Sequence, residues 1–105
     1  MFCMTVSYPI KEGSQFDHIY YRENHLPLCE QLFSDYGYKG NILRTDTGRS
    51  PTGHPCEYAS VDLLFETSEG LQAAVVAKGA EVSADVPQFT NVTPRVVFSK
   101  IVTCT

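Results

Sequence analysis

Hydrophobic and polar residues alternate along residues 2–8, which predicts a first β-strand. A longer alternation from Glu57 to Glu66 predicts a second, clearer strand, and residues 41–47 and 95–103 predict two more. Each of these two strands has one apolar face. In the first strand this face consists of Phe2, Met4, Val6 and Tyr8, and the other face of Cys3, Thr5 and Ser7. In the clearest strand the apolar face consists of Ala59, Val61, Leu63 and Phe65, and the other face of Tyr58, Ser60, Asp62 and Leu64.

Residues 16–33 repeat their apolar positions with the period of a helix, and one apolar position is occupied by histidine. Ser14, with Asp17 three residues later, resembles a capping box and predicts the helix start. Pro27 lies inside the pattern and is expected to kink the helix, because it has no N–H for the carbonyl of Glu23. The apolar side of this helix consists of Tyr21, His25, Leu28, Cys29, Leu32 and Tyr36.

A second helix is predicted after the strand at residues 57–66. Thr67 and Ser68 are suitable N-cap residues, and Gly79 is expected to end the helix. Residues 80–94 are then expected to be irregular, with at most one helical turn before Pro87.

The predicted order of elements is βαββαβ in one domain spanning residues 1–105, which indicates an α+β sandwich. A four-stranded antiparallel sheet would carry both helices on one face. The other face would hold few charges, chiefly Asp62 and Lys100, so we expect a second copy of the chain to cover it. An antiparallel pairing of the last strand with the first would also bring Cys3 near Cys104, as two reduced thiols rather than a disulfide.

Composition narrows the class of protein. Hydrophobic residues make up 43% of the chain and charged residues 19%, which are values typical of globular proteins. The net charge is −4, and the basic residues form no cluster of the kind that binds nucleic acid. No apolar run approaches the ~20 residues that span a bilayer, so no membrane partner is expected. Four dispersed cysteines and an uncharged amino terminus favour a reducing, cytoplasmic location, and no metal site is predicted.

Two motifs resemble those of a known family. The pattern Phe-Asp-x-x-Tyr-Tyr-x-x-x-His-x-Pro-Leu at residues 16–28 and Asp-x-x-x-Phe-Thr at residues 85–90 are similar to the EthD family. The resemblance covers nearly the whole chain. It implies a ferredoxin-like fold, a homodimer of the dimeric α/β-barrel kind, and a cofactor-free pocket for a small molecule between sheet and helices. Relatives in that group include polyketide cyclases, monooxygenases and isomerases, so the resemblance does not select one reaction.

His25 is the leading candidate for catalysis, because a neutral imidazole can exchange a proton near neutral pH. Tyr21, one turn earlier, could orient the ring or donate to a developing oxyanion. The alternative is a core histidine bonded to a tyrosine or to a backbone carbonyl such as that of Glu23. Cys29 could pair with the imidazole, although core packing is the more common role of such a cysteine.

Further residues are candidates for substrate binding. Asp85 could accept a hydrogen bond from a site histidine, but capping the turn before Pro87 is the more common role. Asn24 lies at the edge of the apolar stripe, Leu28 lies within it, and Phe89 belongs to an aromatic-rich interior that would suit a flat apolar ligand. Asp62 could lie either in the subunit interface or in the pocket.

The sequence thus leaves three alternative functions open. The leading one is acid–base chemistry on a hydrophobic, aromatic or polyketide-like compound, such as cyclisation, isomerisation, lyase chemistry or oxygenation. The second is non-catalytic binding of such a molecule in a degradation or secondary-metabolite pathway. The third is a closed pocket, with the protein acting through its surface.

Overall fold

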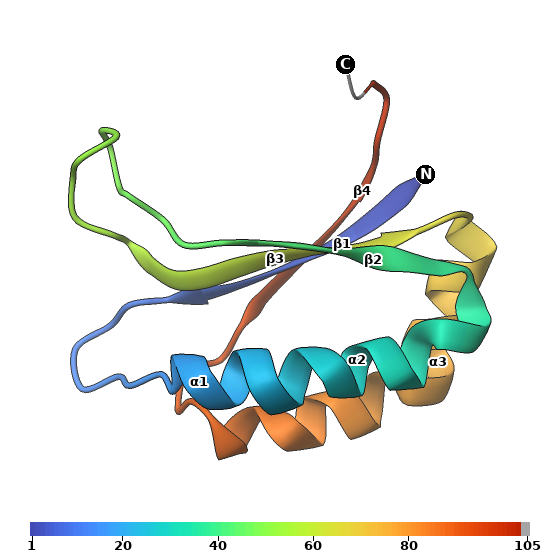
Figure 1. The fold of residues 1–105 in the computed structure, drawn as a ribbon, viewed down its shortest axis with the longest axis horizontal. Coiled ribbons are helices and arrows are strands. Elements are labelled where there is room, and N and C mark those ends of the chain that lie inside the picture. Colours follow the sequence, from blue (N-terminus) through green and yellow to red (C-terminus); the bar gives the residue numbers. More distant parts are fainter. Residues whose placement is uncertain (104–105) are drawn as a thin grey trace.

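The computed structural model describes residues 1–103 and contains one antiparallel sheet with helices on one side (Figure 1). The strands are β1 (Phe2–Pro9), β2 (Tyr38–Arg44), β3 (Glu57–Phe65) and β4 (Arg95–Lys100), in the spatial order β2-β3-β1-β4. The predicted α+β class, the βαββαβ order and the pairing of the last strand with the first are therefore confirmed. Cys104 lies outside the described residues.

The helical layer differs from the prediction in the length of its second helix. The first helical segment consists of α1 (His18–Tyr20), a π-helical turn (Tyr21–His25), α2 (Leu26–Phe33) and a 3-10 turn (Ser34–Tyr36). The second, α3 (Ser68–Asp85), continues six residues beyond Gly79 and is followed by a 3-10 turn (Val86–Gln88). The expectation that Gly79 ends the helix was wrong, and most of the predicted irregular segment before Pro87 is helical.

The apolar faces predicted for β1 and β3 form one continuous surface that faces the helices. Met4 pairs with Leu63 and Val6 with Val61, and on the other side Met4 pairs with Phe98 of β4. The core lies between this face and the helices, as in Figure 1, where both helical segments lie below the sheet. The predicted alternation of these two strands is therefore confirmed over their central residues.

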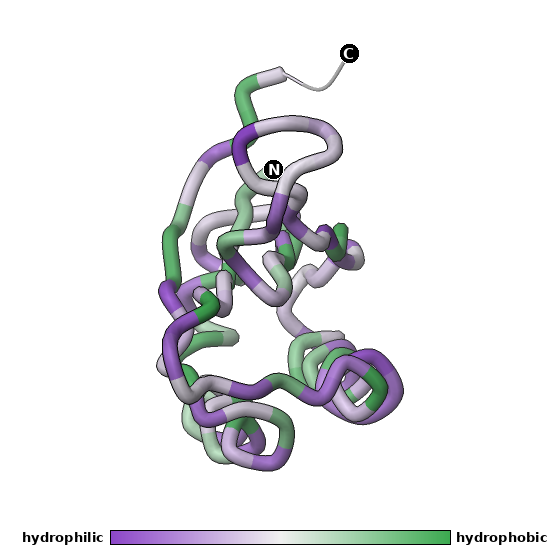
Figure 2. Tube along the Cα trace, turned by 90° about the vertical axis from the view of Figure 1, so that its left-hand side faces the viewer, coloured by the Kyte–Doolittle hydropathy of each residue, from purple (hydrophilic) through white to green (hydrophobic). Residues whose placement is uncertain are grey.

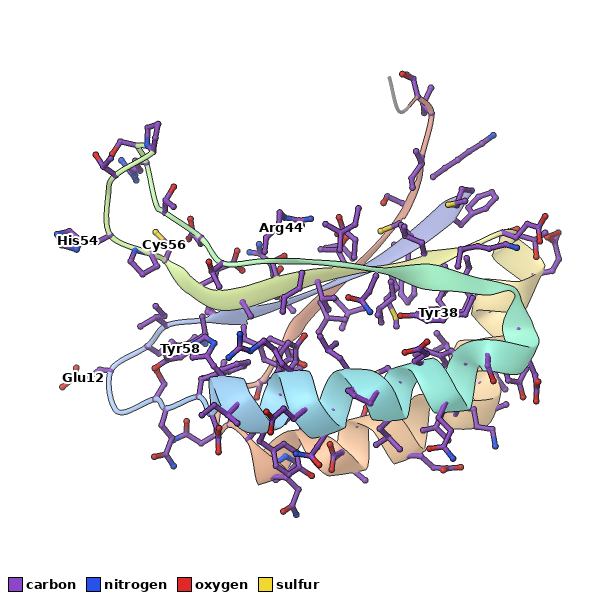
Figure 3. The ribbon with its side chains drawn as sticks, viewed as in Figure 1. Glu12, Tyr38, Arg44, His54, Cys56 and Tyr58 are labelled. Carbon is purple, nitrogen blue, oxygen red and sulfur yellow. The ribbon has the colours of Figure 1, made fainter. Side chains whose placement is uncertain are left out.

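The alternation fails at one end of β3. A register shift between Tyr8 and Pro9 leaves Tyr58 opposite no residue of β1, so its side chain turns towards the helices. Tyr58 stacks on Phe16 with ring centroids 5.3 Å apart, and Figure 3 shows it below the sheet. The expectation that Tyr58 shares a face with Asp62 was wrong, because a bulge reverses the direction of the side chain.

The face of the sheet away from the helices is more polar than predicted. Arg44 pairs through both terminal nitrogens with Asp62, and Thr5 donates to the same carboxylate. Figure 3 shows Arg44 on this side. Arg95, opposite Ser7, is also on this face, whereas Lys100 lies opposite Phe2 and therefore projects to the helix side. The placement of Lys100 among the charges of this face was wrong.

The edge strand β4 is apolar but poorly covered. Val96, Val97 and Phe98 are 46%, 52% and 55% exposed, respectively. Figure 2 shows a hydrophobic stretch along one edge of the molecule in the segment leading to the C-terminus. The helical layer therefore leaves one side of the core open along β4.

Candidate functional site

The first helix begins later than its sequence suggested. The Asp17 carboxylate caps it by accepting from the backbone N–H of Tyr20 at 3.0 Å, so Asp17 is the N-cap and the predicted Ser14 start was wrong. Ser14 instead accepts from the backbone N–H of Lys11, and its hydroxyl lies 2.8 Å from that of Tyr58. Asp17 is preferred because its side chain satisfies a free N–H of the first turn, as an N-cap does.

A π-helical turn then positions the central histidine. The backbone N–H of Leu26 bonds to the carbonyl of Tyr21, five residues earlier. Pro27 follows directly and has no N–H with which to resume the regular hydrogen bonds of an α-helix. The irregularity predicted at Pro27 therefore takes the form of a π turn. Tyr21 and His25 both point inwards from this turn, with their rings stacked at a centroid distance of 5.5 Å.

His25 is joined to the far end of the second helix. Its Nδ1 lies 2.9 Å from Oδ2 of Asp85, the last residue of α3, and the imidazole is only 3% exposed. The other carboxylate oxygen of Asp85 accepts a hydrogen bond from the Tyr20 hydroxyl at 2.8 Å. Asp85 caps no turn with its side chain. Of the two roles weighed from sequence, the structure shows the bond to the histidine and contradicts the cap.

This contact determines which nitrogen of the imidazole can act as a base. An ionised carboxylate is only an acceptor, so Nδ1 carries the hydrogen and Nε2 keeps its lone pair. Burial lowers the pKa of His25 below its usual 6.5, and the Asp85 hydrogen bond and charge partly oppose that shift. The ring is therefore neutral at pH 7, and the carboxylate would stabilise the imidazolium formed when Nε2 takes a proton.

His25 lines a cavity of about 170 Å³ between the sheet and the helices. The cavity is bounded by β1 and β3 above, by α2 and α3 below, and by β4 at its side. Its walls are mostly apolar, and their polar groups come from Tyr8, Tyr21, His25, Cys29 and Ser83. An apolar pocket with a few polar groups is the usual form of a small-molecule site.

The hydroxyls and the thiol in this cavity remain protonated near pH 7. Burial raises the pKa of Tyr8 and of Tyr21 above their usual value of 10, and it raises the pKa of Cys29 to about 12. The buried Tyr21 hydroxyl has no partner at full hydrogen-bond geometry among residues 1–103, although the Tyr8 hydroxyl lies close enough to contribute to its raised pKa, so it is a donor available to a ligand oxygen. The raised pKa of Cys29 agrees with core packing and not with a thiolate–imidazole pair.

Phe89 closes one side of the histidine. Its ring centroid lies 4.6 Å from that of His25 and 5.0 Å from that of Tyr21. The backbone carbonyl of Phe89 accepts from the N–H of Asp17, so the segment after α3 is attached to the start of α1. Both motif segments, residues 16–28 and 85–90, therefore meet at this one site.

The other candidate residues lie elsewhere. Asn24 is exposed and Leu28 is half-buried, and neither lines the cavity. Asp62 is on the opposite face of the sheet, and the two histidines of the chain besides His25, which are His18 and His54, are exposed. Residues 1–103 hold no cluster of three metal-ligating side chains, and no helix among them is long and apolar enough to cross a membrane.

Sequence reasoning missed Tyr20 and Ser83 as members of this site. Tyr8 was predicted as part of the aromatic-rich interior that would suit a flat ligand, but the role of its hydroxyl as a polar group of the cavity was not predicted. Tyr20 and Tyr21 are adjacent, and only the π turn shows that one faces Asp85 and the other the cavity. Ser83 lies in the segment that was expected to be irregular.

Comparison with known proteins identifies the fold class of the chain. No family model and no curated protein matches the sequence. A dimeric ferredoxin-like protein from an uncultured marine organism has the same fold, with a TM-score of 0.57 and 12% identity, covering 100% of this chain and 98% of that one. The fold is thus that of the ferredoxin-like α+β proteins.

Two further structures are more specific. An EthD-like protein from Ralstonia eutropha JMP134 superposes with a TM-score of 0.85 and 25% identity, covering 97% of this chain and 92% of that one. An EthD family protein from Bacillus halodurans C-125 superposes with a TM-score of 0.73 and 20% identity, covering 96% of this chain and 98% of that one. The resemblance read from the two motifs is confirmed, since the chain is similar to these two EthD-like proteins over nearly its whole length.

Proposed function

We propose that the cavity binds a small, largely apolar molecule and that Nε2 of His25 removes a proton from it as a general base. The observation that carries this proposal is the bond from His25 Nδ1 to Asp85, which leaves the second nitrogen free at the cavity wall. Tyr21 assists by donating its unpartnered hydroxyl to the oxygen on which negative charge develops. Proton transfer of this kind needs no cofactor, because the imidazole itself supplies the base.

Cyclisation, isomerisation, lyase reactions and oxygenation of a carbanion can all begin with this proton abstraction. The apolar walls favour an aromatic or polyketide-like compound with an acidic C–H bond. Burial supports the role of His25, because a lowered pKa keeps the base unprotonated near neutral pH.

We also propose that the protein is a homodimer, with 1–105 as its single domain. None of residues 1–103 forms a second layer on the side of the sheet away from the helices, and Ile42 and Val97 are about half exposed there. The polar group of Arg44, Asp62 and Thr5 at its centre would fix the register of the two sheets. The ferredoxin-like protein from the marine organism is described as dimeric, which agrees with this proposal.

A probe with an acidic C–H bond tests the base directly. In 5-nitrobenzisoxazole, Nε2 would take the proton from carbon 3 while the nitrogen–oxygen bond breaks, and its electron pair leaves on oxygen as a coloured 2-cyano-4-nitrophenolate. The imidazolium then returns the proton to solvent. Because general bases contribute about 10²–10⁴-fold, His25→Ala should lower the protein-dependent rate by about 100-fold or more.

The matched control is His18→Ala, which removes an exposed histidine outside the cavity. An equal rate in wild type and His25→Ala would overturn the base assignment, as would a wild-type rate no greater than that of free imidazole at the same concentration. If the wild type binds the probe without accelerating its reaction, the alternative function, non-catalytic binding, replaces the enzymatic one.

A further inference from the structure

A second hollow adjoins the cavity on the open side of the molecule. It is a groove of about 470 Å³ between α3 and β4. The groove and the cavity share two wall residues, Val75 of α3 and Phe98 of β4. Phe98 is 55% exposed and Val75 is partly buried, so these side chains lie where the cavity joins the surface groove.

The walls of the groove are apolar along its length and polar at one end. Phe2, Leu71 and Val76 continue the apolar surface from the cavity, and Val76 is 80% exposed. An apolar surface of this kind, continuous with a ligand cavity, suits an extended hydrocarbon. Ser68, Gln72, Ser99 and Lys100 supply the polar groups of the groove.

Lys100 gives that end a positive charge. Its ammonium lies 6.0 Å from the centroid of the Phe2 ring, and within residues 1–103 it has no carboxylate at ion-pair distance. Val96, which lines the cavity, and Lys100 project to the same side of β4. The strand rise of ~3.3 Å per residue puts them ~13 Å apart.

We propose that the substrate is an elongated amphiphile with an anionic end. Its acidic C–H group would lie beside His25, its apolar body would pass between Val75 and Phe98, and its anionic terminus would pair with Lys100. The chemistry assigned to the reacting end rests on the proposed function, whereas recognition of the tail and the charge rests on the groove alone.

Decanoate is the probe for the tail and the charge, with decanol as its uncharged counterpart and hexanoate as a shorter anion. Calorimetric titration of the wild type should show that decanoate binds more tightly than either. Lys100→Gln should weaken the binding of decanoate about threefold and leave the binding of decanol unchanged, because an exposed ion pair is worth ~0.2–1 kcal/mol. Raising the salt concentration should have the same selective effect.

Val76 offers a pair of matched variants at a position where substitution costs little folding stability, since this side chain is 80% exposed. Val76→Glu should weaken decanoate binding and Val76→Lys should strengthen it, with decanol affected equally by both. Equal affinities for decanoate and decanol would overturn the anionic end, and equal affinities for decanoate and hexanoate would overturn the use of the groove.

The competing occupant of the groove is a second copy of the chain. If decanoate binds only when the protein is diluted to single subunits, the groove is an interface and the proposal fails. The test is separate from that of the base, because decanoate binding is measured without turnover, and His25→Ala should retain that binding while it loses turnover of 5-nitrobenzisoxazole.

Discussion

Nδ1 of His25 and Oδ2 of Asp85 lie 2.9 Å apart, although 60 residues separate them in the chain. One residue comes from a π turn in the first helical segment and the other from the last turn of α3. The contact therefore couples the two helices at the cavity wall, and it gives the imidazole one defined tautomer.

The first prediction concerns this contact. Asp85→Asn keeps the size of the side chain but removes the charge that stabilises the imidazolium. Because hydrogen bonds to charged groups are worth ~1.5–3 kcal/mol, turnover of 5-nitrobenzisoxazole should fall by about 10- to 100-fold. In the wild type the Asp85 charge raises the pKa of His25. The pKa seen in the pH–rate profile of Asp85→Asn should therefore move further below 6.5.

Tyr20→Phe is the matched control for Asp85→Asn. It removes the other hydrogen bond to the carboxylate and leaves the charge in place. It should lower the rate much less than Asp85→Asn does. A pH–rate midpoint that is the same in wild type and Asp85→Asn would show that the carboxylate does not act through the imidazole.

The sequence predicted the strands of the sheet well because the alternation that defines each strand is a local pattern. The alternation in β1 and β3 has a period of two, and apart from Tyr58 the faces it defines are the faces observed. The site was only half predicted. His25 and Tyr21 stand out as polar groups on an apolar helical stripe, whereas the role of Asp85 depends on where α3 ends.

Gly79 is the reason that the end of α3 was misplaced. Glycine commonly ends a helix through a left-handed conformation, but here it remains helical and lines the cavity. Tertiary packing against α2 and the sheet outweighs the helix propensity of one residue. The helix thus extends to residue 85, and no local pattern in residues 80–85 shows that its last carboxylate will meet His25.

The second prediction uses two glycines of α3. A methyl group on Gly79 would meet Val75 at 3.7 Å, which is ordinary contact, so Gly79→Ala should stabilise the protein by up to about 1 kcal/mol. A methyl group on Gly70 would clash with the backbone carbonyl of Tyr36, so Gly70→Ala should destabilise it by about 1–3 kcal/mol. Urea denaturation measures both changes, and the opposite order of stabilities would contradict the placement of α3.

The third prediction is the pH dependence of stability. Burial lowers the pKa of His25 in the folded protein, so the unfolded chain binds this proton more readily. The free energy of unfolding should therefore fall as the pH drops through 6.5, and the fall should end below the pKa of the folded state. Denaturation of wild type and His25→Gln between pH 8 and pH 5 isolates this contribution, which the variant should lack. The same slope in both proteins would contradict it.

The fourth prediction tests the dimer through Arg44, which is 2.6 Å from Asp62 on the open face of the sheet. In a single subunit the Arg44 side chain is 48% exposed, so Arg44→Met should cost no more than about 1 kcal/mol of folding free energy. In a dimer that buries this face, the same change leaves the Asp62 carboxylate unpaired, at a cost of about 3–5 kcal/mol. The variant dimer should therefore dissociate at concentrations at least about 100-fold higher than the wild type.

Lys39→Met breaks an exposed ion pair with Glu66 and should leave dissociation unchanged. Sedimentation over a dilution series measures this, and a wild type that remains a single subunit at every concentration would refute the dimer.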